Sequence, residues 1–438
     1  MKRSWIFLCL GALMAVGQTA AAERPNIVFI LADDLGYADP GFNGGTQIHT
    51  PHLDKLAREG TVLKSFYVQP LCSPTRAALL TGRYPMRHGL QVGVITPRAP
   101  FGLPLEERTL ADALREAGYF TAICGKWHLG DFRREYWPNQ RGFDHAYGHL
   151  FGMLDYFTHI RNGIVDWYRN GERVVEEGYT THLIAREAVR VIREHGGERP
   201  FFLYVPFNAV HTPLQVPEEY MKPYQHLPEK RRKLAGMLAA LDEAVGQIVA
   251  AVEEKGLRRN TLFVFSSDNG GPNPGRVTDN SPLRGGKATL YEGGVRVCAF
   301  ATWDGHIPAG RQLDEPMHIV DWFPTLVKLA GGSLAPDKQK LPLDGRDIWP
   351  TLTAGAPSPH QEILLNAAPN AGAIRVGDWK LKLRRTREGE QVELFNLAHD
   401  IAEKNNLAAA HSDKVKELRA RYERWAAQAA PPKNKPKL

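Results

Sequence analysis

The sequence predicts a layered α/β fold, in which a large and mostly parallel central sheet is flanked by helices, followed by a small C-terminal α+β unit with an antiparallel sheet. Three observations predict it. Apolar strand-like runs alternate with amphipathic helix-like segments over most of the chain. The composition then changes near residue 335, where five prolines within residues 336–359 mark a loosely structured connection. Short strand-like runs and one last helical segment follow.

The first unit is expected to begin with a buried strand and a helix. The run Asn26–Ala32 (NIVFILA) predicts a fully buried strand, and Thr50 with Pro51 predicts the start of a helix that ends at Gly60. Further strands are expected at Tyr119–Cys124, Phe201–Phe207, Thr261–Ser267 and Val295–Ala299, and further helices at Thr109–Ala117, Thr181–Glu194 and Lys230–Glu254. Strands separated by helices imply a mostly parallel sheet, and such sheets hold their sites at the carboxyl edge of the strands.

The C-terminal unit is expected within residues 346–430, after a larger unit that spans residues 23–345. Its strands are expected at Glu362–Asn366, Ala373–Val376, Trp379–Leu383 and Val392–Leu397, before a helix from Ser412 to about Ala427. Residues 431–438 form the one basic run of the chain. A solvated, disordered tail explains this run better than an arm that binds nucleic acid.

Residues 1–22 have the pattern of a secretory signal peptide. Lys2 and Arg3 precede the apolar run Trp5–Val16, and Ala20-Ala21-Ala22 is a small-residue cleavage site. The run is too short to cross about 30 Å of hydrocarbon, so no membrane anchor is expected. Removal of the leader lowers the formal net charge from +7 to +5, because it carries two basic residues and no acidic one. We expect an exported protein of the bacterial periplasm or the extracellular space, without a nucleic-acid partner.

The sharpest motif is Cys72-Ser73-Pro74-Thr75-Arg76, which is followed by Ala77–Arg83 (AALLTGR). Ser73 and Pro74 suit an N-cap and a first turn, so Cys72 is expected just ahead of a helix whose N–H groups attract negative charge. Taken alone, the cysteine allows a low-pKa thiol or a merely packed one. Cys124 and Cys298 lie in apolar runs and are expected to be buried thiols rather than a disulfide.

Five further groups of polar residues follow the strands or lie close to them. The strings are Asp33-Asp34-Leu35-Gly36, Gly125–Gly130 (GKWHLG), His211-Thr212-Pro213, Asp268-Asn269-Gly270-Gly271, and Pro282–Thr289 (PLRGGKAT) with Lys287. Each residue has an ordinary alternative explanation: paired aspartates cap helices, single histidines are satisfied core groups, and a lysine covers the surface. Four of the five strings come directly after predicted strands, which instead indicates one site at the sheet edge.

Together with the Cys72 motif, these strings resemble the signatures of the formylglycine-dependent (type I) sulfatases, in the same order. In that family a formylglycine-generating enzyme reads Cys-x-Pro-x-Arg and converts the cysteine into an aldehyde, formylglycine (3-oxoalanine). The resemblance covers nearly the whole mature chain and implies an alkaline-phosphatase-like fold and hydrolysis of sulfuric esters. Three longer strings resemble the arylsulfatase B (N-acetylgalactosamine-4-sulfatase) branch, namely Gln69–Gln91, Pro213–Tyr224 and His318–Gly331. The implied substrates are an aryl sulfate or a sulfated oligosaccharide with 4-O-sulfated galactose or N-acetylgalactosamine.

The residue types also predict a metal. Asp33, Asp34, Asp268 and Asn269 offer only oxygen ligands, which suit Ca²⁺ or, less well, Mg²⁺. No histidine is expected to join them, which argues against zinc. The resemblance adds residue 72 to the ligands, through a hydroxyl of the hydrated aldehyde. It gives the cation the roles of Lewis acid and template.

The resemblance implies a role for each remaining site residue. Arg76 and Lys126 would stabilise the aldehyde hydrate, Lys287 and His211 would bind the sulfate, and one of these two would protonate the departing sugar oxygen. An ordinary serine or cysteine would keep the sulfate as a stable ester. The hydrate has a second hydroxyl, and its deprotonation by His128 would expel sulfate from the covalent sulfo-enzyme intermediate and restore the aldehyde. Two steps would thus replace one difficult hydrolysis.

Two alternatives from other functional classes stay open at this point. One is a phosphodiesterase or phosphonate monoester hydrolase on the same fold. Lys126, His211 and Lys287 lie in sulfatase-like strings and favour a singly charged sulfate ester over it. The other is a polysaccharide-binding protein without activity. Such a protein would be expected to lose Cys72 or a metal carboxylate, and this chain keeps them all.

Overall fold

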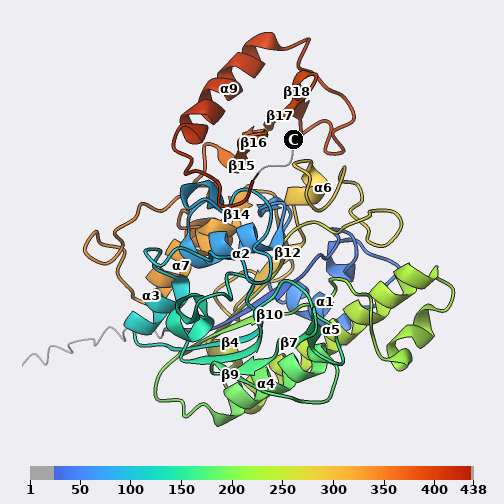
Figure 1. The fold of residues 1–438 in the computed structure, drawn as a ribbon, viewed down its shortest axis with the longest axis vertical. Coiled ribbons are helices and arrows are strands. Elements are labelled where there is room, and N and C mark those ends of the chain that lie inside the picture. Colours follow the sequence, from blue (N-terminus) through green and yellow to red (C-terminus); the bar gives the residue numbers. More distant parts are fainter. Residues whose placement is uncertain (1–23, 436–438) are drawn as a thin grey trace, which may run out of the picture.

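The computed structural model describes residues 24–435, so the predicted signal peptide and residues 436–438 lie outside the described residues. A ten-stranded mixed sheet runs through the larger part of the molecule (Figure 1). Its order is β13 (Arg311–Leu313), β2 (Thr61–Leu63), β12 (Ala299–Thr302), β11 (Thr261–Ser267), β1 (Asn26–Ala32), β10 (Phe201–Pro206), β4 (Phe120–Lys126), β5 (His145–His149), β8 (Tyr168–Arg169) and β9 (Glu172–Arg173).

The centre of this sheet is parallel, as the sequence predicts. Strands β11, β1, β10, β4 and β5 pair in parallel, whereas β12 on one side and β8 with β9 on the other pair in antiparallel fashion. Strand β1 has the predicted bounds, and all seven of its residues are buried. A strand that is covered on both faces reads as a continuous apolar run, which is why the NIVFILA run predicts it so well.

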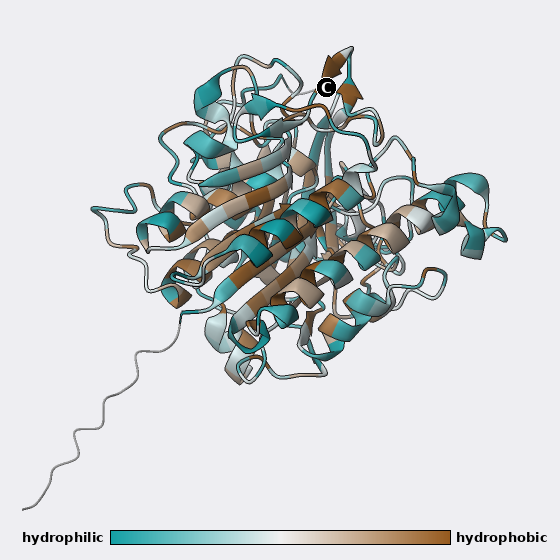
Figure 2. Ribbon diagram, turned by 90° about the horizontal axis from the view of Figure 1, so that it is seen from below, coloured by the Kyte–Doolittle hydropathy of each residue, from teal (hydrophilic) through white to brown (hydrophobic). Residues whose placement is uncertain are grey.

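Helices cover both faces of the sheet and bury one core against each. Helices α1 (Pro51–Arg58), α4 (Thr180–Glu194) and α5 (Glu229–Glu254) pack on one face, and α2 (Cys72–Thr81), α3 (Leu110–Glu116) and α7 (Trp322–Leu329) pack on the other. Figure 2 shows helices striped with hydrophobic and hydrophilic residues beside strands that are mostly hydrophobic. Among the described residues only α5 is long and apolar enough to cross a membrane, and 72% of its apolar window is buried in the fold. Helix α5 is therefore a core helix of this fold.

One predicted strand is wrong. The run Val295–Ala299 was expected to form a strand, but α6 (Glu292–Val295) ends in it and β12 begins only at Ala299. Its apolar side chains are buried all the same. The backbone pairs singly with the short strand β3 (Phe66–Tyr67) and the residue after it, through Val68 N–H to the Val295 carbonyl and Val297 N–H to the Phe66 carbonyl. The apolar residues of this run indicate that it is buried, but they do not make it a strand.

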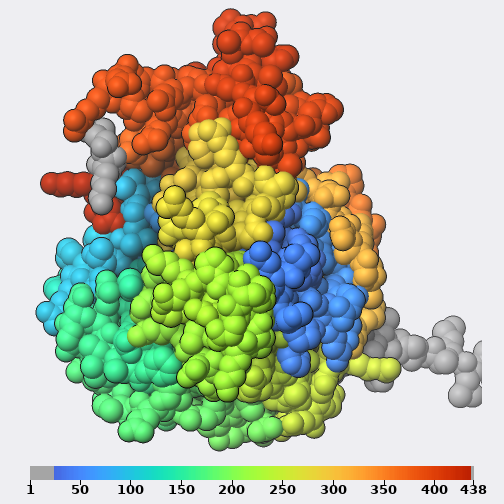
Figure 3. Space-filling model, turned by 90° about the vertical axis from the view of Figure 1, so that its right-hand side faces the viewer, coloured from blue at the N-terminus to red at the C-terminus, as the bar shows by residue number. Residues whose placement is uncertain are grey.

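The C-terminal unit is an antiparallel sheet with one packed helix, as expected. The strands are β15 (Ile363–Ala368), β16 (Ala371–Val376), β17 (Trp379–Thr386) and β18 (Gly389–Asn396), and the helix is α9 (Ser412–Ala426). Figure 3 shows this unit seated against the segments of the larger unit around residues 270–300. The remaining short elements are β14 (Met317–His318), β6 (Ile160–Arg161), β7 (Ile164–Val165) and α8 (Trp349–Ala354).

Part of the segment expected to be a disordered tail lies against the body of the protein. The Ala430 N–H donates to the Met86 carbonyl over 2.8 Å, and the Lys433 N–H donates to the Gly89 carbonyl over the same distance. The Asn434 side chain donates to the carbonyls of two further loop residues, Val92 and Val94. These bonds fix residues 430–434 along the loop that follows α2.

A buried ionic cluster joins the two units. Lys380 of β17 contacts Glu292 of α6 and Glu403, each over 2.8 Å, and all three side chains are fully buried. Removal of the lysine would leave Glu403 without its counter-ion and Glu292 with the longer ion pair to Arg296, which is 3.5 Å. We expect Lys380→Ala to lower the free energy of unfolding by about 3–5 kcal/mol, measured by urea denaturation.

The matched control for this prediction is Lys416→Ala on α9. Lys416 pairs with Asp413 in solvent, so its loss should change the free energy of unfolding by less than about 0.5 kcal/mol. Equal stability of the two variants would contradict the assigned role of the cluster.

Candidate active site

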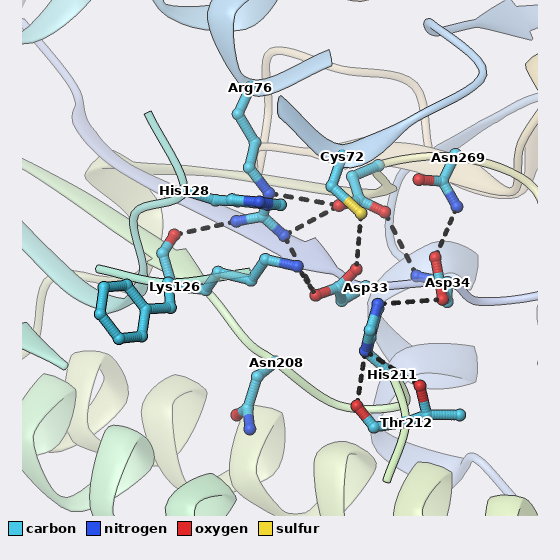
Figure 4. Close-up of polar contacts among 12 residues, drawn as sticks. Asp33, Asp34, Cys72, Arg76, Lys126, His128, Asn208, His211, Thr212 and Asn269 are labelled. Carbon is cyan, nitrogen blue, oxygen red and sulfur yellow. Dashed lines mark hydrogen bonds and ion pairs between the residues drawn. The ribbon is translucent and has the colours of Figure 1, made fainter. Parts of the chain in front are cut away.

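The predicted site residues converge at the carboxyl edge of the parallel sheet (Figure 4). Asp33 and Asp34 follow β1, Asp268 and Asn269 follow β11, and His211 lies beyond the end of β10. Because these three strands are parallel neighbours, their carboxyl ends meet at one place. The topology therefore brings together strings that lie far apart in the sequence.

Cys72 is the first residue of α2, so the helix begins two residues earlier than predicted. Leu71 is the N-cap, since its carbonyl accepts the Thr75 N–H over 3.1 Å. The Ser73 hydroxyl, which was expected to cap the helix, instead accepts the N–H of Ile95 over 3.1 Å. The helix start thus places residue 72 where the positive end of the helix dipole attracts an anion.

The Cys72 thiol lies between opposite charges. Its Sγ atom is 3.4 Å from Asp33 Oδ1 and 3.4 Å from Lys287 Nζ, and the side chain is almost fully buried. Burial, together with the carboxylates of Asp268 and Asp33, raises the pKa of the Cys72 thiol well above its usual range. These side chains therefore favour a protonated thiol, and they do not support the alternative of a low-pKa nucleophilic cysteine.

Two buried cations surround the carboxylates. Arg76 donates from Nε and Nη2 to Asp268 Oδ2 over 3.2 and 2.9 Å, and from Nη1 to the Lys126 carbonyl over 2.9 Å. The Lys126 ammonium forms an ion pair with Asp33. Burial alone would raise the pKa of Asp33, but Lys126, His211 and Arg76 lower it well below its usual range. Asp33 is therefore held as a carboxylate.

The four predicted metal ligands fit a hard cation. Burial and the nearby Asp33 raise the pKa of Asp268 to about 7, because several carboxylates lie close together here. Asn269 donates from Nδ2 to Asp34 Oδ1 over 2.7 Å, while its Oδ1 atom is buried without a hydrogen-bond partner among the described residues. An orphaned buried amide oxygen beside three carboxylates is the arrangement that a Ca²⁺ ion would satisfy.

The structure brings one histidine, His211, closer to these ligands than the sequence predicts. His211 Nε2 lies 3.6 Å from Asp34 Oδ2, and potential ligand atoms of His211, Asp33, Asp34 and Cys72 all lie within 4.8 Å of one another. The fold of the loop after β10 brings the ring there, which the separate strings did not reveal. His211 Nδ1 donates to the Thr212 carbonyl over 2.6 Å, so Nε2 is the atom that faces the cluster.

Lys287 and His211 form the partly exposed edge of the cluster. The side chains of Asp33, Arg76 and Lys126 are fully buried, whereas those of Lys287 and His211 are 19% and 12% exposed. Lys287 also contacts the carboxylate of Asp34, whose Oδ1 is 2.7 Å from its Nζ atom. A ligand that reaches residue 72 therefore passes Lys287 and His211.

His128 is placed as a neutral base. Its Nε2 atom lies 3.0 Å from the Ile95 carbonyl, to which it donates, and its buried Nδ1 has no partner among the described residues. Burial and the nearby Lys126 lower the pKa of His128 well below its usual range. The ring packs so closely on Gly152 that a β-carbon there would lie 2.4 Å from His128 Nε2.

Three residues that hold His128 in place could not be found from sequence motifs. They are Ile95 and Gly152, described above, and Asp166, whose carboxylate accepts the N–H groups of Leu150 and Phe151 over 3.2 and 2.8 Å. Asp166 thereby fixes the loop that covers His128. Backbone atoms and a lone buried aspartate carry no local signal, because only the tertiary fold gives them a role.

Known proteins resemble this chain over most of its length. The family model described as Sulfatase matches residues 25–333. Mouse arylsulfatase J is 37% identical, over 96% of this chain and 78% of that protein. Human arylsulfatase A is 36% identical, over 86% of this chain and 77% of that protein. The N-acetylgalactosamine-6-sulfatase of the dog is 36% identical, over 80% of this chain and 70% of that protein.

Solved structures give the same result. The structure of Ps i-CgsB in complex with k-i-k-neocarrahexaose superposes with a TM-score of 0.87 at 36% identity, covering 94% of both chains. The PsFucS1 sulfatase from Pseudoalteromonas sp. superposes with a TM-score of 0.79 at 28% identity, covering 93% of this chain and 90% of that one. The phosphonate monoester hydrolase of Agrobacterium radiobacter, at 22% identity and a TM-score of 0.66, shares the fold.

Proposed function

The chain belongs to the sulfatase family, and from this premise we propose that it removes the sulfate group of a 4-O-sulfated galactose or N-acetylgalactosamine residue of a glycan. Its relatives include arylsulfatases and N-acetylgalactosamine-6-sulfatases, so it is a sulfuric ester hydrolase that acts on sulfated sugars. The 4-O position in the proposal is supported by the strings that resemble the 4-sulfatase branch. The observation that carries the proposal is the placement of Cys72 at a helix start, with the Lys287 ammonium 3.4 Å from its sulfur.

The nucleophile in this proposal is residue 72 after a formylglycine-generating enzyme has converted the cysteine into an aldehyde. Arg76 and Lys126 lie among the surrounding carboxylates and would hold the hydrated side chain in place. Asp33, Asp34, Asp268 and Asn269 would hold the cation. When bound, Ca²⁺ supplies positive charge that neutralises sulfate oxygens and positions the ester.

Lys287 and His211 lie at the opening and would act on different atoms of the substrate. Burial alone would lower the pKa of Lys287, but the acidic groups around it, Asp34 and Asp33 among them, raise that pKa well above its usual range. Lys287 thus stays charged and suits a sulfate oxygen. Burial lowers the pKa of His211 while the carboxylates of Asp34 and Asp33 raise it, so a proton on its Nε2 atom would be released readily. Because Lys287 keeps its charge, the protonated ring of His211 is the proposed acid for the departing sugar oxygen.

His128 would complete the reaction as a base. Its unpartnered Nδ1 is buried in the site and unprotonated in the tautomer that the Ile95 carbonyl selects. Removal of a proton from the second hydroxyl at residue 72 would expel sulfate and restore the aldehyde. The second hydroxyl is therefore the group that allows sulfate to leave residue 72.

A substrate comparison tests this function. We expect hydrolysis of p-nitrophenyl sulfate to exceed that of the phosphate diester and the phosphonate ester by about a hundredfold in kcat/KM, because the chain belongs to the sulfatase family. All three esters carry a single negative charge, so the comparison isolates the group that reacts. Exhaustive chelation should abolish turnover, and Ca²⁺ rather than Zn²⁺ should restore it. On sugars, the 4-O-sulfated galactose and N-acetylgalactosamine should exceed the 6-O-sulfated ones. A preference for the phosphonate ester, or full activity after chelation, would overturn the proposal.

We also infer that the mature enzyme acts outside the cytoplasm, in the bacterial periplasm or beyond it. The support is the signal-peptide pattern of residues 1–22.

A further inference from the structure

A cleft of about 860 Å³ lies between the catalytic unit and the C-terminal sheet. One wall is formed by residues of the α2 start and of the loop 91–96, and a second by residues 288–291. Strands β15 to β18 and the tail residues Asn434 and Lys435 complete it. The volume falls in the range of sites that hold ligands of several rings.

The cleft begins beside the nucleophile. Its lining includes Leu71 and Pro74, which flank Cys72 in the first turn of α2, and Ala288, which follows Lys287. Lys287 is in turn one of the two partly exposed residues at the opening of the site. A glycan whose sulfate reaches residue 72 therefore has a path into this cleft for the sugars on one side of it.

The charged residues that line the cleft are all basic. They are Lys382, Arg384 and Lys435, and no aspartate or glutamate lines it within residues 24–435. Lys382 is occupied, because it pairs with Glu393 and lies 4.1 Å from the centre of the Tyr291 ring. Arg384 and Lys435 are exposed, and neither side chain has an ion pair or hydrogen bond within the described part of the chain.

The two unpaired cations stand on fixed backbone. Arg384 lies within β17, where it pairs with Ala371 of β16 on one side and with Gln391 of β18 on the other. Lys435 follows Asn434, whose side chain donates to two carbonyls of the loop after α2. Because the backbone is already fixed, only the two side chains have to be ordered when an anion binds.

We propose that this cleft binds a second anionic group of the glycan, on a sugar next to the one that is desulfated, with Arg384 and Lys435 as its contacts. The inference rests on the proposed function. A guanidinium can bind a sulfate ester or a uronate carboxylate through two parallel hydrogen bonds, so either group fits the chemistry. The enzyme would then select glycan chains that carry anions on neighbouring sugars.

The test compares oligosaccharides of one length that differ only on the neighbouring sugar, which is neutral, sulfated or a uronate. The measured quantity is the ratio of kcat/KM for each charged substrate over the neutral one. In the wild-type enzyme at least one ratio should be about ten or more, and Arg384→Ala should lower it about tenfold, through KM. Lys435→Ala should lower it less, and Arg384→Lys should keep most of it, because charge is retained.

The matched control is Arg387→Ala, an exposed arginine that follows β17 and does not line the cleft. Its ratios should equal those of the wild type, and melting temperatures should show that all variants are folded. Comparing the ratio for the sulfated neighbour with the ratio for the uronate neighbour shows which of the two anions the cleft prefers. Ratios near one in the wild type, or ratios that Arg384→Ala leaves unchanged, would overturn the inference. Failure to release sulfate even from the neutral-neighbour substrate would instead count against the proposed function.

Discussion

Replacing Cys72 with alanine is expected to lower kcat/KM for p-nitrophenyl sulfate by about 10⁴- to 10⁶-fold, the usual cost of removing a catalytic nucleophile. The site would keep its cations and carboxylates but lose the atom that attacks sulfur. Cys124→Ala is the matched control, because Cys124 is an equally buried free thiol, on β4, that no step of the mechanism uses. Steady-state release of p-nitrophenol measures both variants.

Cys72→Ser sharpens this prediction. A serine hydroxyl can accept the sulfate but has no second hydroxyl to expel it, so this variant should release at most one equivalent of phenol per enzyme. Continuous turnover by Cys72→Ala or Cys72→Ser would contradict the role of residue 72.

The second large effect separates the two histidines. We expect His128→Ala to attack an activated aryl sulfate once and then stall, with a burst of p-nitrophenol and about 80 Da of added sulfate on the peptide that contains residue 72. The reason is that the unpartnered Nδ1 of His128 is the base that restores the aldehyde. His211→Ala should instead lose most activity with sugar leaving groups and least with p-nitrophenol, since only a poor leaving group needs the proton.

The two variants should therefore differ in kind and not merely in degree. His226→Ala, which removes an exposed histidine away from the cluster, should behave as the wild type. A clean steady state without adduct in His128→Ala would show that the roles are assigned wrongly. An adduct on His211→Ala would lead to the same conclusion.

The sequence predicts the buried parallel core and the helices with little error. It fails where a buried apolar run is not a strand, or where a strand has no apolar pattern. Asn26–Ala32 is right to the residue, because a strand covered on both faces is a continuous apolar run. Val295–Ala299 is also apolar apart from Arg296, yet two glycines precede it and its backbone has only single hydrogen-bond partners. A helix end and a link therefore occupy this run. The short strands β8 and β9 carry no apolar pattern and could not be predicted.

The site shows the same division. The side chains proposed to take part in the reaction lie in sequence motifs. The sequence alone therefore predicts that Asp33, Lys126 and Asp268 lie at one sheet edge. The approach of His211 to the carboxylates depends on how the loop after β10 folds back, and no motif encodes a distance. Asp166 acts only through the backbone that it fixes.

The most direct test of the account is the mass of residue 72 in active enzyme. Trypsin should release residues 65–76 as one peptide, since Lys64 precedes it and Arg76 ends it. Conversion of cysteine into formylglycine removes one sulfur and two hydrogens and adds one oxygen, so the peptide should weigh about 18 Da less than the cysteine form and react with hydrazides. A fully active enzyme whose peptide keeps the cysteine mass and alkylates as a thiol would contradict the account.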